Sequence, residues 1–239
     1  MSGYNGSVKS YRQYCGLAKA LDVIGDRWNL LIVRELLARS PLRYTDLRKG
    51  LPGIATNLLA DRLHELEVSG VVRRYEAPPP VATTVFELTP RGQDLWPVVR
   101  ELGRWGRPLL AEPAGEDAFR IHWLAVPARL HLTDHAPDQP PVTLVLRSGD
   151  EALTFETGGG AVRVRAGGAE TPDAVLTGPP ELLVGVLVGT MGLDQARARG
   201  LRVDGDLTAL HRLRPPSATA AVAPPVSRRA ARAQTPSRD

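Results

Sequence analysis

The stretch from Tyr44 to Tyr75 constrains the fold more than any other part of the chain. It opens with a segment long enough for a short helix, and a turn that carries Pro52 and Gly53 follows. A longer segment with helical periodicity comes next, ends at Gly70 and leads into a β-rich segment. Because proline and glycine interrupt helices, this order predicts two helices joined by a tight turn and followed by a strand.

The longer of these helices has two unlike faces on a wheel of about 100° per residue. Its apolar face carries Leu58, Leu59, Leu63 and Leu66. The opposite face carries Asn57, Ala60, Asp61 and His64. The leucine face predicts packing against a core, and the opposite face is free either to enter a DNA groove or to remain a solvated helix surface.

The segments after Gly70 favour the first alternative. Residues 71–76 and 83–88 are rich in β-forming side chains and flank a proline-rich loop, so they predict a hairpin. Thr89 and Pro90 then form a typical helix start, with a helix to about Leu110 that Pro97 should bend. Two helices, a hairpin wing and a further helix are the parts of a winged helix-turn-helix, a DNA-binding fold.

Within this fold, Asn57 lies in the first turn of the second helix, where an amide can pair with adenine. Thr56 can reach a thymine methyl group or a phosphate, whereas Arg62 lies at the edge of the leucine face and favours a phosphate contact or an internal ion pair. Arg73 and Arg74 are candidates for contacts to the DNA backbone. The full set of predicted DNA-binding residues is Arg43, Thr45, Thr56, Asn57, Ala60, Asp61, Arg62, His64, Arg73 and Arg74.

Several motifs in this region occur in the order and spacing of one bacterial family. They are Cys15–Trp28 (CGLAKALDVIGDRW), Leu30–Ile32 (LLI), Tyr44–Leu47 (YTDL), Leu51–Ile54 (LPGI), Arg62–Leu66 (RLHEL) and, with Tyr75, Glu87–Gly92 (ELTPRG). Residues 10–110 thereby resemble the HxlR-type branch of the MarR-like regulators. The resemblance implies a homodimeric winged-helix transcription regulator that binds pseudo-palindromic operators in double-stranded DNA. It also implies a dimer interface made by the N-terminal segment and the helix after the wing.

Two residues before the helix-turn-helix have competing interpretations. Trp28 is expected in the core, on an apolar helix face with Leu31, Ile32 and Leu36. Cys15 matches the family's cysteine, which some relatives use as a redox or electrophile sensor. The alternative is a small residue packed near the dimer interface.

The charge distribution divides the chain into three parts. Residues 1–110 hold 16 Lys and Arg against 11 Asp and Glu, residues 111–213 hold 9 against 14, and the residues from Arg214 onward hold 5 against 1. A basic N-terminal part suits a polyanion, whereas the acidic middle should be repelled by DNA. The sequence therefore predicts a single DNA-binding domain, and its basic, proline-containing tail predicts disorder.

The middle part has the pattern of an α+β domain. Strands are expected at 141–146, 153–157, 161–165 and 174–177 in an antiparallel meander, and helices at 181–188, 194–199 and 207–213. With its motifs Pro172–Gly178, Leu182–Gly189 and Gly200–Leu207, this part resembles the SCP2-like sterol-carrier domain, which implies a sheet covered by helices around an apolar cavity. Candidate ligand-pocket residues are Leu182, Leu183, Val186 and Leu187, although core packing explains the same stripe.

The sequence gives little indication of a disulfide, a metal site or a catalytic site. One cysteine excludes an intramolecular disulfide and a cysteine-rich zinc site. His122, His131, Asp134 and His135 have near-ligand spacing, but nearby prolines favour a loop and isolated histidines. We expect no metal, no cofactor and no catalytic residues, since the usual nucleophile and phosphate-loop motifs are missing. No leader and no long apolar run occur, which predicts a cytoplasmic protein without a membrane span.

We therefore expect a non-enzymatic α+β protein with three segments: a winged helix-turn-helix and dimerisation domain at 1–112, an SCP2-like domain at 117–213 and a disordered basic tail at 214–239. Its predicted function is transcription regulation through operator binding, modulated by a small hydrophobic ligand in the second domain. The alternatives are a hydrophobic-ligand carrier with vestigial DNA binding and, after it, a small enzyme acting in the C-terminal pocket.

Overall fold

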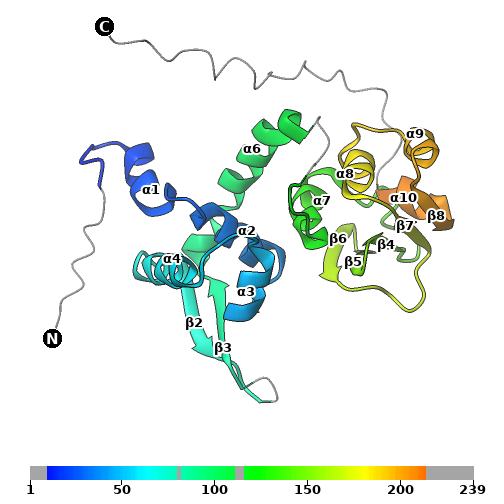
Figure 1. Ribbon diagram of the computed structural model, residues 1–239. Coiled ribbons are helices and arrows are strands. Elements are labelled where there is room, and N and C mark those ends of the chain that lie inside the picture. The colour runs from blue at the N-terminus through cyan, green and yellow to red at the C-terminus, as the bar shows by residue number, and fades with distance from the viewer. Residues whose placement is uncertain (1–9, 80–81, 111–115, 214–239) are drawn as a thin grey trace, which may run out of the picture.

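The computed structural model describes residues 10–79, 82–110 and 116–213, which form an N-terminal region (10–110) and a C-terminal region (116–213), each with its own sheet and core (Figure 1). The predicted disordered tail, 214–239, lies outside the described residues, as do Pro80 and Val81 of the wing loop. No helix in the described parts is long and apolar enough to cross a membrane.

The N-terminal region is a winged helix-turn-helix, as the sequence predicted. Its helices are α1 (Gly16–Ile24), α2 (Asn29–Ala38), α3 (Tyr44–Gly50), α4 (Thr56–Val68), α5 (Pro90–Gln93) and α6 (Trp96–Gly106), followed by the 3₁₀ turn η1 (Arg107–Leu110). Its strands are β1 (Leu42–Arg43), β2 (Val72–Glu76) and β3 (Thr84–Leu88), in the antiparallel order β1-β3-β2. The short strand β1 was not expected.

The turn between α3 and α4 has the predicted cause. Gly53 has a φ of 87°, in the left-handed region that glycine adopts without steric cost. The Tyr44 hydroxyl donates a hydrogen bond of 2.6 Å to the carbonyl of Thr56, so the first residue of α3 is tied to the first residue of α4. Gly70, with a φ of 71°, follows the end of α4.

The helix after the wing begins as predicted but is divided. The Thr89 side chain caps α5 by accepting a hydrogen bond of 3.1 Å from the Gly92 amide, with Pro90 at the first helical position. Pro97 lies in the first turn of α6, where its missing N–H costs nothing. The expected single bent helix is therefore wrong, because the chain ends α5 and begins a new helix just before this proline.

The position of Leu31 on α2 also differs from the prediction, which placed it on the core face of the helix. The buried side of α2 carries Ile32, Val33, Leu36 and Leu37. Leu31 falls outside this arc and is 41% exposed, and Trp28 is half-buried at the start of the helix with a φ of 83°. Trp28 still packs against the N-terminal core, as expected.

The C-terminal region is an α+β unit. It contains η2 (Ile121–Leu124), α7 (Ala125–His131), β4 (Thr143–Ser148), β5 (Glu151–Gly158), β6 (Ala161–Ala166), β7 (Ala174–Thr177), α8 (Pro180–Val188), α9 (Leu193–Ala198), β8 (Arg202–Gly205) and α10 (Leu207–Leu213). The helices pack on the sheet face that holds Leu144, Leu146, Leu153 and Phe155. The sequence did not predict η2, α7 or β8.

The predicted antiparallel meander is wrong at one pairing. The sheet has the order β6-β5-β4-β7-β8, and β7 runs parallel to β4 with Leu144 opposite Ala174. The chain leaves β6 at one edge of the sheet and crosses β5 and β4 before it enters β7, which lies between β4 and β8. Residues 167–173 make this crossing, and the buried Thr154 hydroxyl donates a 2.7 Å hydrogen bond to the carbonyl of Gly167 at its start.

Candidate nucleic-acid interface

Helix α4 presents the two faces that its sequence indicated. Leu59, Leu63 and Leu66 are at most 3% exposed and pack into the N-terminal core, whereas Leu58 is half-buried at its edge. The residues of the opposite face, all exposed, are Asn57, Ala60, Asp61 and His64. The fold therefore leaves one polar side of this 13-residue helix open along most of its length.

The start of α4 is electrostatically suited to a phosphate. Ala55 occupies the N-cap position and has no side chain that could accept a hydrogen bond from the first turn. The amides of this turn carry the positive end of the helix dipole, which favours anions. The exposed Thr56 follows Ala55, so a hydroxyl donor lies beside these amides.

Arg62 is held inside the protein by acidic partners. Its Nη1 atom lies 2.5 Å from Asp26 Oδ2 and also pairs with Glu65. Only 19% of the Arg62 side chain is exposed. Of the two roles considered from sequence, the structure shows the internal ion pair, which joins α4 to the segment before α2.

Arg73 and Arg74 point outward from β2 but each has a carboxylate partner. The Arg73 Nε atom lies 2.5 Å from Glu87 Oε1 on the paired strand, and the Arg74 Nε atom lies 3.2 Å from Glu67 Oε1 at the end of α4. About two thirds of each arginine side chain stays exposed. Both can meet a DNA phosphate, at the cost of competing with an exposed ion pair, which is a weak interaction.

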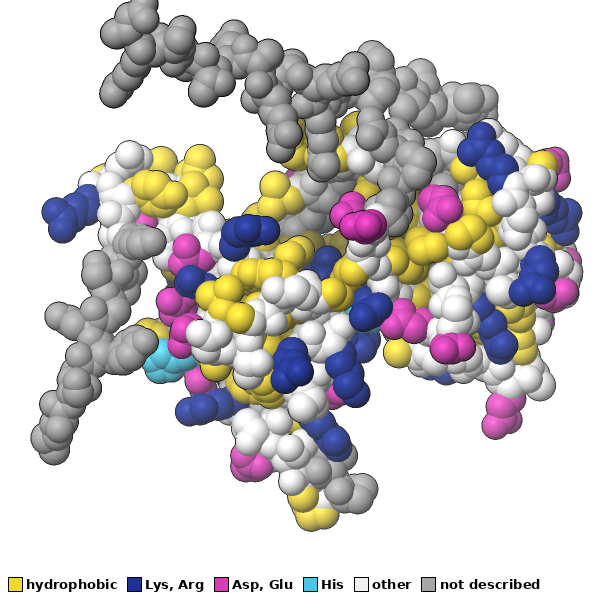
Figure 2. Space-filling view, viewed as in Figure 1, with side chains coloured by type: hydrophobic (Ala, Val, Ile, Leu, Met, Phe, Trp, Pro, Cys, Tyr) yellow, Lys and Arg dark blue, Asp and Glu magenta, His cyan; other side chains and the backbone are white. Residues whose placement is uncertain are grey.

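Helix α3 carries two cations, Arg48 and Lys49, that the sequence interpretation missed, and both are exposed in its last turn. The predicted residues Arg43 and Thr45 are exposed at the start of the same helix. Figure 2 shows Lys and Arg side chains gathered over α3. The signal that could have found them is the adjacent pair of cations at the end of the short helix, next to the predicted turn.

Cys15 occupies the N-cap position of α1 and is exposed. Its thiol lies near the free amides of the first helical turn, and the backbone N–H groups of Ala18 and then of Leu17 lower the pKa of Cys15. A thiolate is the nucleophilic form of cysteine, so a lowered pKa increases the fraction of Cys15 in that form at a given pH.

The remaining candidate residues lie away from this surface. Leu182, Leu183, Val186 and Leu187 are at most 3% exposed in the C-terminal core. Nothing in the structure gathers the near-ligand set into a metal site: His122 bonds to Glu35, and Asp134 bonds to Arg212. Among the described residues, no group of three His, Cys, Asp or Glu is placed to hold a metal ion.

An exposed polar helix face, set by a tight turn and followed by a hairpin, defines a winged-helix DNA-binding protein. A family model described as HxlR-like helix-turn-helix matches residues 23–113. YvaP, an HTH-type transcriptional regulator of Bacillus subtilis, is 37% identical over 87 residues, which cover 36% of this chain and 80% of YvaP. An HTH-type transcriptional regulator of Halalkalibacterium halodurans is 32% identical over 106 residues, covering 44% of this chain and 93% of the relative.

Among solved structures, the reduced form of the transcriptional regulator YodB from B. subtilis is 32% identical and covers 39% of this chain and 92% of that chain, with a TM-score of 0.36. The chain belongs to the HxlR-like helix-turn-helix family. Its relatives are named as transcriptional regulators, and the protein is a DNA-binding regulator through its N-terminal region. These matches cover less than half of the chain.

The lowered pKa of Cys15 gives a direct prediction. A lower pKa means that the thiolate forms at lower pH, so the rate of alkylation by iodoacetamide in the folded chain should rise at lower pH than in the same chain unfolded in guanidinium chloride. Since Cys15 is the only cysteine, the label reports on this residue alone. Coincident pH profiles would show that the α1 amides do not stabilise the thiolate.

Proposed function

We propose that the protein is a homodimeric, sequence-specific transcription regulator that binds a pseudo-palindromic operator through the exposed face of α4. The observation that carries the proposal is the open face formed by Asn57, Ala60, Asp61 and His64. Tyr44 and the turn at Gly53 hold α4 against α3 and fix the angle at which this face meets DNA. The exposed basic residues on α3 and β2 belong to the same N-terminal region as α4. They supply contacts to phosphates.

The base contacts can be tested with DNA duplexes selected from random sequence by the wild-type chain. Asn57→Ala and His64→Ala should each weaken binding to the selected duplex by about 1–3 kcal/mol, because a lost base contact typically costs that much. Binding to a random duplex should change little. Affinity and sequence preference are measured by fluorescence anisotropy titration.

The matched control is Arg74→Ala, which should weaken binding to selected and random duplexes alike and lower the log-log salt slope by about 1. Unchanged sequence preference in both α4 variants would place base contact on another surface. If the wild-type chain enriches no sequence at all, the alternative function stands, a hydrophobic-ligand carrier with vestigial DNA binding.

The homodimer proposal rests on apolar side chains that the described chain leaves uncovered. Helix α6 has no buried residue, and its exposed stripe is Val98, Leu102, Trp105 and Leu109, the last of these just beyond the helix in η1. Leu17 and Leu21 of α1 are exposed as well, and Figure 2 shows apolar side chains on this helix. The spacing of three or four residues puts the α6 stripe on one side, which suits packing against a second copy.

Leu102→Glu should therefore convert the dimer to a monomer in sedimentation velocity, because the new charge would have to be buried without a partner. Val68→Glu is the control, since Val68 is also exposed and apolar but lies at the end of α4, outside the stripe. Equal sedimentation of the two variants would show that α6 does not form the interface.

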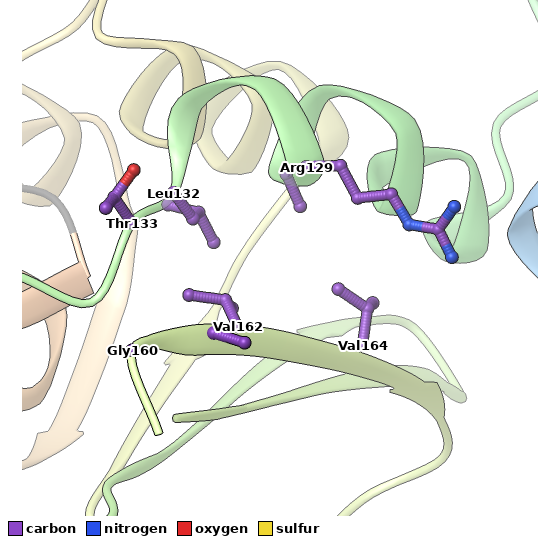
Figure 3. A pocket seen from close by; sticks show the side chains of 8 residues that line it. Arg129, Leu132, Thr133, Gly160, Val162 and Val164 are labelled. Atoms are coloured by element: carbon purple, nitrogen blue, oxygen red, sulfur yellow. The ribbon is translucent and has the colours of Figure 1, made fainter. Parts of the chain in front are cut away.

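We further propose that the C-terminal region is an SCP2-like domain that takes a small hydrophobic ligand and thereby modulates DNA binding. Support comes from a cleft of about 250 Å³ between α7 and β6. In Figure 3, Leu132 lies across from Val162, and the Arg129 and Thr133 side chains bring polar groups to the edge. This cleft, rather than the buried stripe of α8, offers room for an apolar chain whose polar end meets Arg129.

Dodecanoate serves as a probe of this cleft. It should raise the thermal unfolding midpoint of the wild-type chain, because a ligand that binds only the folded state stabilises it. Val164→Phe, which fills the cleft, should abolish the shift, whereas Val203→Phe on the opposite edge strand should retain it. A shift that survives in Val164→Phe, or no shift in the wild type, would remove the support for this site.

A further inference from the structure

Glu35 is a carboxylate with no exposed surface, buried between the two regions of the chain. Its Oε1 atom accepts hydrogen bonds from Arg34 Nη2 at 2.9 Å and from Trp123 Nε1 at 2.7 Å. Its Oε2 atom accepts from Arg39 Nη2 at 3.0 Å and lies 2.7 Å from His122 Nε2. Four groups therefore surround one carboxylate, two from α2 and its C-cap residue and two from η2 of the C-terminal region.

The Glu35 carboxylate stays charged because of these four partners. Burial raises the pKa of Glu35, but the hydrogen bond and charge of His122, followed by those of Arg34, outweigh burial and hold the pKa below its ordinary value. A buried charge is stable only while its hydrogen bonds are made. Loss of the bonds from His122 and Trp123 would leave the Glu35 carboxylate with only its two arginine partners.

The same carboxylate lies against the DNA-binding motif. A Cβ atom at Gly50 would collide with Glu35 Oε2, so only glycine fits at the end of α3. The neighbouring carbonyl, that of Lys49, accepts a hydrogen bond of 3.4 Å from Arg120 Nε, just before η2. The end of α3, from which the chain turns into α4, is therefore packed against Glu35 and against the start of the C-terminal region.

We propose that His122 and Trp123 are positioning residues for DNA recognition. They complete the hydrogen bonding of Glu35, and Glu35 in turn fixes the end of α3 and so the orientation of α4. This inference rests on the proposed binding of DNA by α4. It makes the C-terminal region part of the DNA-binding framework rather than a separately folding appendage, and any event that displaces η2 or α7 would reach α4 through one carboxylate.

Trp123→Phe tests this with little change of shape. Phenylalanine keeps a ring below the Arg34 guanidinium, which lies 4.2 Å from the Trp123 ring centroid, and removes the N–H that binds Glu35. Trp96→Phe is the matched control at the same boundary. The Trp96 ring lies on α6, with its centroid 5.7 Å from the Arg129 guanidinium of α7, and Trp96 is not among the four residues that bond to Glu35.

The first measurement is the ratio of affinities for a selected and a random duplex, with the full chain. Trp123→Phe should lower this ratio by about 5-fold or more, in the range of typical coupling between sites, while random-duplex affinity stays constant. Trp96→Phe should leave the ratio unchanged. A wild-type chain without sequence preference would overturn the proposed function, whereas a preference that Trp123→Phe retains in full would overturn the positioning role.

The second measurement needs no DNA. Hydrogen exchange of the α3 amides should become about 10-fold faster in Trp123→Phe, because a lost hydrogen bond to a buried charge lowers local stability, and Trp96→Phe should not show this. Faster exchange in η2 alone would overturn the proposal, as would a uniform increase over the whole chain. In a double-mutant cycle, Trp123→Phe should have little further effect on exchange once Glu35→Gln has removed the charge.

Discussion

The buried Glu35 carboxylate is the interaction on which the relation between the two regions depends. Most of the described protein divides into two apolar cores that share no residue. Apolar contact between such cores can slide, because the hydrophobic effect has no direction. Hydrogen bonds to a buried charge have fixed geometry, so the bonds from η2 to Glu35 set one position of the C-terminal region relative to α2 and α3.

This arrangement has a physical cost. Removing a carboxylate from water is unfavourable, and replacing such a group by apolar residues often stabilises a protein. The benefit is a fixed orientation. The free energy rises steeply when the hydrogen-bond partners of Glu35 are displaced, whereas a displaced leucine loses only part of its contact area. A winged helix needs such orientation because base edges form hydrogen bonds only with side chains presented at a defined angle.

The sequence predicted the helix-turn-helix and the wing because each boundary has a local chemical cause. The turn at Gly53, the end of α4 at Gly70 and the cap at Thr89 depend on residues within a few positions of the structure they make. The polar face of α4 was likewise predictable, since helical periodicity alone separates Asn57 from the leucines. The HxlR family match confirms the fold class of this region.

Non-local features could not be predicted in this way. The parallel pairing of β4 with β7 brings together segments about thirty residues apart, and no local signal distinguishes it from a continued meander. Arg73 and Arg74 were predicted to contact the DNA backbone, but their carboxylate partners Glu87 and Glu67 lie on other elements and had no local signal. His122 was interpreted as an isolated histidine, because its partner Glu35 is 87 residues earlier in the chain.

Glu35 shows how such a residue can still be recognised from a structure. In the sequence it is one of two charged residues, beside Arg34, in a mostly apolar helix, and a solvated position is the ordinary expectation for glutamate. Its complete burial places it outside that expectation, and a buried charge must have partners that compensate it. Following those partners leads from α2 in the family's DNA-binding fold to η2, which lies beyond the residues that the family model matches. The boundary between the regions is therefore also the place where the second region can act on the first.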